Sequence, residues 1–107
     1  MEESSVIDCL SALAHAVRLQ VFRALVVAGP AGLTPGVMQE GLGIAAATLS
    51  FHLKELSRSG LVSVERSSRH LIYRAEIARI NDMVGYLTEN CCAGIACVPQ
   101  PAAACGC

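Results

Sequence analysis

Apolar residues recur at helical spacing in two successive segments at the start of the chain. From residue 5 to residue 18 they fall on one face, and Ser4 or Ser5 is placed to cap the first turn. The same spacing continues from residue 19 to residue 28 and stops at Gly29 and Pro30, a pair that ends helices. The pattern therefore predicts two helices that meet near Arg18.

A short helix and a longer amphipathic helix are predicted next. Thr34 and Pro35 supply an N-cap and a proline at the first helical position, and the short helix runs towards Gly41. In the segment 45–59, apolar residues at i, i+4 and i+7 must face inward, namely Leu49, Leu53 and Leu56. Small, polar and basic residues occupy the other face, and Gly60 ends the helix. Two helices joined by a tight, glycine-containing turn form a helix-turn-helix.

Two alternating segments after Gly60 predict a β-hairpin. Residues 61–66 and 70–75 alternate between apolar and polar, and the link 67–69 is short, polar and basic, as in a wing. Helical spacing returns from residue 78 to about residue 90, and no period follows Cys92. We therefore predict a mainly α, α+β fold, a winged helix-turn-helix of order ααααββα over residues 1–90. A cysteine-rich tail over residues 91–107 follows it.

The composition favours a globular chain that covers part of its surface with a second copy. Hydrophobic residues make up 53% of the 107 residues and aromatic residues only 4%, so aliphatic side chains must fill the core. Such a surplus of aliphatic residues in a short chain predicts a homodimer. The acidic N-terminus is unlike a signal peptide, and prolines and glycines interrupt the long uncharged stretches. We expect a cytoplasmic protein with no membrane partner.

Basic residues gather in the second half of the chain although the formal net charge is −1. Between residues 50 and 75, five basic side chains stand against two acidic ones, a local charge of +3. Salt screens the attraction between basic side chains and phosphate groups beyond about 8–10 Å. A basic face on a protein of nearly zero net charge is therefore sufficient to bind nucleic acid.

The six cysteines are distributed unevenly. Cys9 stands alone, whereas the other five lie in the last stretch, at Cys91, Cys92, Cys97, Cys105 and Cys107. In a reducing compartment, clustered thiols are more often metal ligands or redox sensors than structural disulfides. A lone cysteine such as Cys9 is more often a small buried apolar residue. The tail therefore carries the candidate chemistry of this chain.

Four segments together resemble the ArsR/SmtB family of bacterial metal-responsive repressors. They are residues 13–19 (LAHAVRL), 48–56 (TLSFHLKEL), 60–62 (GLV) and 72–74 (IYR). The likeness extends from about residue 6 to residue 90, and Ala16 stands where the family often has proline. The resemblance implies a homodimer built from the first and last helices that binds double-stranded operator DNA.

The resemblance also assigns the DNA-facing side chains. On the recognition helix and the wing these are Thr48, Ser50, His52, Lys54, Arg58, Arg66 and Arg69. In such a dimer the two half-sites lie about 34–36 Å apart, one turn of DNA. Ala45, Ala46 and Ala47 precede Thr48, where many relatives carry hydroxyl or amide side chains, so direct base readout by hydrogen bonds is expected to be sparse.

The effector site is placed at the end of the last helix. Founding arsenic sensors of the family carry Cys-x-Cys before the turn, whereas residues 34–40 contain no cysteine here. Zinc sensors use aspartate and histidine on the last helix, where this chain has Asp82 but no histidine. The thiolates of Cys91, Cys92 and Cys97 match the three soft sulfur ligands that As(III) or Sb(III) takes, while zinc prefers four ligands. Cys9, Cys105 and Cys107 remain open as further ligands.

Three alternatives to a metalloid-responsive repressor remain in view. The first is a repressor of the same fold that responds to oxidation of these thiols, and the second is a metalloid-sequestering protein. The third is a cysteine-based enzyme such as an arsenate reductase. The sequence argues against the enzyme, because no lysine or arginine follows Arg79 to hold an oxyanion or lower a thiol pKa.

Overall fold

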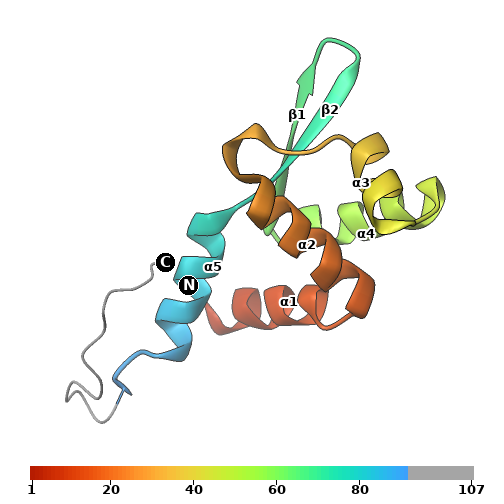
Figure 1. Cartoon of the computed structure of the whole chain (residues 1–107). Helices are drawn as coiled ribbons and strands as arrows, with labels where there is room; N and C mark the ends of the chain where they lie inside the picture. Colours follow the sequence, from red (N-terminus) through yellow and green to blue (C-terminus); the bar gives the residue numbers. More distant parts are fainter. Residues whose placement is uncertain (92–107) are drawn as a thin grey trace.

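Five helices and a two-stranded antiparallel hairpin follow one another in the computed structural model, which describes residues 1–91. The hairpin projects from one end of the helices, and α5 lies at the other end, near the N-terminus (Figure 1). The elements are α1 (Glu3–Leu13), α2 (Ala16–Ala28), a 3-10 turn (Gly29–Ala31), α3 (Pro35–Leu42), α4 (Ala46–Arg58), β1 (Val62–Ser67), β2 (His70–Ala75) and α5 (Ile77–Leu87). This order confirms the predicted winged helix-turn-helix.

The boundary between α1 and α2 lies earlier than the sequence pattern predicts. Helix α1 ends at Leu13, and the Nδ1 atom of His15 accepts a hydrogen bond from the backbone N–H of Val17 at 3.2 Å, which caps α2. Leu13 and Val17 both pack against the core, so the apolar spacing continues across the break and conceals it. The predicted junction near Arg18 is therefore wrong by a few residues, because a side-chain cap and not the apolar pattern fixes it.

The hydrophobic core draws side chains from all five helices and from β1. The buried apolar residues are Val6, Cys9, Ala12, Val21, Phe22, Leu25, Met38, Leu49, Leu53, Leu56, Leu61, Val62 and Met83. The inward positions predicted for Leu49, Leu53 and Leu56 are confirmed. Each fully buried leucine stabilises the fold by about 1.5–3 kcal/mol relative to an exposed one. Three such leucines fix the rotation of α4 about its own axis.

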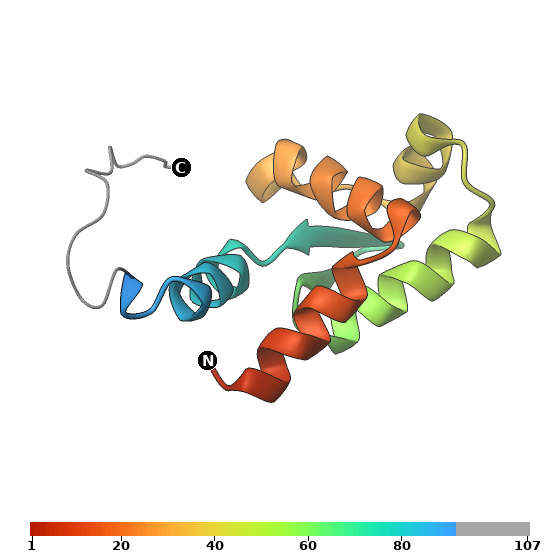
Figure 2. The same cartoon turned by 90° about the horizontal axis from the view of Figure 1, so that it is seen from below.

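Helices α3 and α4 form the helix-turn-helix. Thr34 caps α3 through its Oγ1 atom, which accepts from the backbone N–H of Val37 at 3.4 Å, and Pro35 takes the first helical position, both as predicted. Helix α4 packs against α1, α2 and α3, so its buried side is covered by three helices. Viewed from below, α1 lies alongside α4 (Figure 2).

The wing is joined to the helices through the loop that follows α2. Strands β1 and β2 pair from Val62 with Ala75 to Ser67 with His70, and Ser68 turns the chain with a positive φ of 60°. The backbone of Leu33 exchanges two hydrogen bonds with that of Tyr73, both 2.9 Å long. This bridge makes the base of the wing continuous with the segment leading into α3.

Helix α5 ends at Leu87, about three residues before the predicted end, and a turn leads to Cys91. The predicted tail, apart from Cys91, lies outside the described residues. Over residues 1–91, no single helix is long and apolar enough to cross a membrane; α1 and α2 reach that length only together, across a bend of 100°.

Candidate nucleic-acid interface

Helix α4 presents a polar and basic surface opposite its buried leucines. Thr48, Ser50, Lys54 and Arg58 are all exposed, in agreement with their expected positions on the accessible side of this helix. Leu49, Leu53 and Leu56 anchor the opposite side in the core. The helix therefore offers small hydroxyl and cationic side chains to solvent on a rigid support, as a recognition helix requires.

His52 does not lie where the sequence analysis placed it. Its side chain is only 6% exposed, and its Nδ1 atom accepts a hydrogen bond from Arg18 Nε at 3.1 Å. The ring also lies 4.6 Å from that of His15, centroid to centroid. His52 is therefore a buried link between α4 and α2, and its expected place on the DNA-facing surface is corrected.

The surroundings of His52 favour its neutral form. Burial lowers the pKa of the imidazole below its ordinary value of 6.5, and the nearby His15 and Arg18 lower it further through their charges. The neutral ring keeps a lone pair on Nδ1, which is the acceptor that Arg18 requires. The hydrogen bond and the lowered pKa thus both indicate a neutral His52.

Arg18 and Phe51 form a contact beside the exposed polar side of α4, and neither is among the DNA-facing residues expected from the sequence. The guanidinium carbon of Arg18 lies 5.6 Å from the centre of the Phe51 ring, and that ring is 54% exposed on α4. Arg18 therefore combines a partly buried hydrogen bond to His52 with a cation–π contact to Phe51 at the surface. The sequence signal that could have identified Phe51 is a large aromatic side chain on the polar side of an amphipathic helix.

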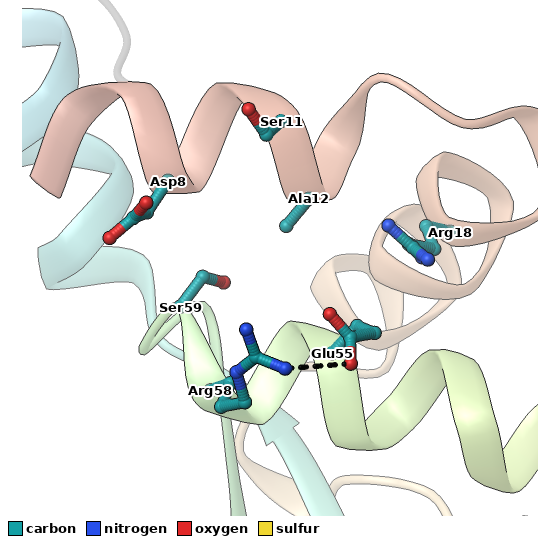
Figure 3. A pocket seen from close by; sticks show the side chains of 7 residues that line it. All are labelled: Asp8, Ser11, Ala12, Arg18, Glu55, Arg58 and Ser59. Atoms are coloured by element: carbon teal, nitrogen blue, oxygen red, sulfur yellow. Dashed lines mark hydrogen bonds and ion pairs between the residues drawn. The ribbon is translucent and has the colours of Figure 1, made fainter. Parts of the chain in front are cut away.

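Arg58 takes part in an ion pair on its own helix. Its Nη1 atom lies 3.1 Å from Glu55 Oε2, at the edge of a polar pocket of about 180 Å³ between α1 and α4 (Figure 3). The pocket is lined by Asp8, Ser11, Ala12, Arg18, Glu55, Arg58 and Ser59. Exposed ion pairs contribute only about 0–1 kcal/mol, so a phosphate group can replace Glu55 as the partner of Arg58 at little cost.

The wing carries two exposed arginines as expected, Arg66 on β1 and Arg69 in the turn. A third arginine counted in the basic stretch, Arg74, has a structural role. Its Nε atom donates to the carbonyl oxygen of Pro30, and its Nη1 atom lies near Glu65 Oε1, both at 2.6 Å. Arg74 ties the wing to the 3-10 turn that follows α2, so less of the local positive charge is available to DNA than the sequence implies.

Of the three predicted effector ligands, only Cys91 belongs to the described residues. It is exposed and lies directly after the turn that follows α5, whereas Cys92 and Cys97 lie outside residues 1–91. Among residues 1–91, no three histidine, cysteine or acidic side chains are close enough to share a metal ion. Cys9 is fully buried, and its Sγ atom lies 3.5 Å from the carbonyl oxygen of Ser59, in keeping with the core position expected for it.

Comparison with known proteins agrees with this geometry. Residues 13–65 match a helix-turn-helix domain family. An ArsR-like transcriptional regulator from Rhodococcus sp. RHA1 has a similar structure, with a TM-score of 0.71 and 24% identity over 78% of this chain and 76% of that one. The biofilm growth-associated repressor of Xylella fastidiosa (strain 9a5c) is 31% identical over 90 residues, which cover 84% of this chain and 76% of that protein. This chain belongs to the ArsR/SmtB family.

Membership of the ArsR/SmtB family makes the chain a transcriptional repressor of the winged-helix type. The matched region, residues 13–65, runs from the end of α1 into β1 and contains the whole helix-turn-helix. A homodimeric winged helix-turn-helix DNA-binding domain from Mycobacterium bovis shares the fold, with a TM-score of 0.64 and 22% identity over 90% of this chain and 89% of that one. The helix-turn-helix makes DNA the partner of this chain.

Proposed function

We propose that this repressor acts in the cytoplasm as a homodimer and leaves its operator when As(III) or Sb(III) binds the thiolates of Cys91, Cys92 and Cys97. The observation that carries the DNA-binding part is the exposed polar and basic side of α4 beside a wing with two exposed arginines. The observation that supports the effector part is the exposed Cys91 directly after the turn that follows α5, next to Cys92 in the sequence.

The dimer is supported by apolar side chains that α1 and α5 leave in water. These are Ile7, Leu10, Ile77, Val84 and Leu87, each between 42% and 56% exposed. Helices α1 and α5 contact each other, so the five residues lie on neighbouring elements. A second copy of the chain would bury them, as a symmetric interface formed by the same patch on both subunits.

A hydrogen bond provides a route from the effector helix to the recognition helix. Arg79, in the first part of α5, donates from Nε to the carbonyl oxygen of Ser59 at 3.2 Å. Ser59 is the residue directly after α4, so a shift of α5 acts on the C-terminal end of that helix. Allosteric coupling of about 1–3 kcal/mol would weaken DNA binding roughly 5- to 150-fold.

The test is fluorescence anisotropy of a labelled duplex from the promoter of the chain's own gene. Fully reduced protein is titrated onto the duplex, and arsenite, zinc, cadmium or hydrogen peroxide is then added in separate experiments. We expect release by arsenite and no release by zinc. Release by peroxide alone would replace the metalloid with thiol oxidation as the signal, and failure of the protein to bind any promoter duplex would refute operator binding.

Serine variants locate the ligands. We expect Cys91→Ser and Cys92→Ser each to keep the DNA affinity of the wild type and to lose the response to arsenite, since a pyramidal As(III) site needs all three sulfurs. The matched control replaces both Cys105 and Cys107 by serine and is expected to retain the response. Arsenite release from either single variant would show that the ligand set is wrong.

A further inference from the structure

Phe51 stands in the middle of the exposed side of the recognition helix. Ala47 and Lys54 are its neighbours at i−4 and i+3, and both are exposed. The ring itself remains 54% exposed, although apolar side chains of this size are normally buried when the fold allows it. Its position on α4 therefore aims an aromatic side chain at whatever α4 contacts.

The exposed ring of Phe51 is held in place from within the domain. The Arg18 guanidinium lies 5.6 Å from the ring centre, and the ring of His52 meets its edge at a centroid distance of 5.4 Å. Arg18 is itself fixed by its 3.1 Å hydrogen bond to the buried His52. A side chain that is held before contact loses less conformational entropy on binding than a mobile one.

The neighbouring residues are poor at reading bases through hydrogen bonds. The residues that open α4 are Ala45, Ala46 and Ala47, so arginine, asparagine and glutamine, which read guanine and adenine, are missing there. The major groove also displays one apolar mark, the C5-methyl group of thymine, which alanine and phenylalanine side chains contact. Ala47 and Phe51, one helical turn apart, form an apolar pair of that kind.

We propose that this repressor recognises its operator through thymine methyl groups, with the Phe51 ring packed against the C5-methyl of a thymine in each half-site and Ala47 beside it. Three exposed cationic side chains, Lys54 on α4 and Arg66 and Arg69 on the wing, then bind the phosphates that flank the groove. Arg18 is the positioning residue that sets the direction of the ring. The inference rests on the DNA-binding part of the proposed function and does not depend on the effector.

The test removes the methyl group and leaves every hydrogen-bonding atom of the base in place. A duplex is first enriched by the wild-type protein from a random pool, and each thymine of its half-site is then replaced in turn by deoxyuridine. Burial of one methyl group corresponds to about a fourfold change in affinity. We expect the wild type to lose about fourfold at one or two positions in each half-site, and to lose nothing at the others.

The Phe51→Ala variant tests whether the Phe51 ring causes the loss of affinity at uracil. The variant is expected to bind the thymine duplex more weakly than the wild type and to lose the distinction between thymine and uracil at the position that the Phe51 ring contacts. Phe51→Leu, which keeps an apolar side chain, is expected to retain part of the discrimination. Val27→Ala, on the 79% exposed Val27 of α2, is the control and is expected to discriminate as the wild type does.

The outcomes separate this inference from the proposed function. If the wild type binds an enriched duplex but shows no loss at any uracil position, methyl recognition is refuted and repression stands. If Phe51→Ala discriminates thymine from uracil as the wild type does, the ring is not the reader. If the random pool yields no duplex that the wild type binds, both the inference and the operator binding on which it rests fail.

Discussion

At the scale of single residues, the contact between Arg18 and His52 explains why a histidine is buried in the recognition helix. The imidazole accepts from Arg18 Nε at 3.1 Å while burial lowers its pKa. A protonated ring would lose this acceptor and place a second positive charge beside the guanidinium. The arrangement is therefore stable only with a neutral His52, and it sets the position of α4 against α2.

The lowered pKa of His52 makes the stability of the domain depend on pH. The unfolded chain takes up a proton at the ordinary pKa of 6.5, whereas the folded chain resists it, so the unfolded state binds more protons as the pH falls through 6.5. We expect the free energy of unfolding to decrease from pH 7.5 towards pH 5.5, and His52→Asn to reduce that decrease, because Asn Oδ1 still accepts from Arg18 without titrating. Urea unfolding of both proteins across this range measures the difference. Parallel pH curves would show that His52 does not titrate as described.

At the scale of elements, the join between the wing and the helices depends on a close approach at Gly32. Its φ is +68°, and a Cβ atom there would lie 2.6 Å from both Ile72 Cγ2 and the carbonyl oxygen of Tyr73. The backbone of Leu33 pairs with Tyr73 next to this point. Only glycine allows β2 to lie so near the loop, and this contact orients the wing relative to α3 and α4.

Alanine substitutions at two glycines of similar conformation distinguish the energetic cost of close packing from that of backbone strain. Gly32→Ala is expected to destabilise the fold by about 2–6 kcal/mol, since it adds atomic overlap to a backbone conformation that only glycine adopts readily. Gly29→Ala is the matched control, because Gly29 has a φ of +69° with no atom within 4 Å of the added Cβ. We expect that control to cost only about 1–3 kcal/mol, the strain of the backbone alone. Chemical denaturation gives both values, and equal losses would mean that the wing does not press on Gly32.

At the scale of the whole molecule, α1 and α5 leave five large apolar side chains exposed, and in the proposed homodimer a second copy of the chain buries them. Leu87 is 56% exposed near the end of α5, close in sequence to the cysteines of the proposed effector site. Dimerisation would therefore place the effector site next to the interface. Binding of an ion there would act on both recognition helices through the same contacts.

A charge in this surface is expected to separate the subunits. Leu87→Glu would bury a carboxylate against apolar side chains of the partner, and the measured mass should fall from about twice the chain mass to 11.2 kDa. Operator affinity should fall with it, because one recognition helix then binds alone. Val27→Glu, at an exposed apolar residue of α2 and outside the proposed α1 and α5 interface, should remain dimeric. Light scattering after size-exclusion chromatography checks the mass, and a dimeric Leu87→Glu would place the interface elsewhere.

The sequence by itself determined the order of elements, the inward side of α4 and the exposure of most predicted DNA-facing residues. These features follow from local rules. The 3.6-residue period identifies the buried leucines Leu49, Leu53 and Leu56, alternation identifies the strands, and Thr34 with Pro35 marks a helix start. Each rule compares residues that are close in the chain, so a single sequence is sufficient to apply it.

Only the tertiary structure decided the orientation and the partners of polar residues at the borders of these patterns. His52 lies beside the buried stripe of α4, and it turns inward because Arg18, 34 residues earlier, offers a donor. Arg74 was counted as free charge, yet it binds Pro30 and Glu65 across the fold. The period of a helix assigns its inner and outer sides, but a polar side chain at the border follows its hydrogen-bond partner. That partner is brought near by the packing of helices and strands distant in the chain.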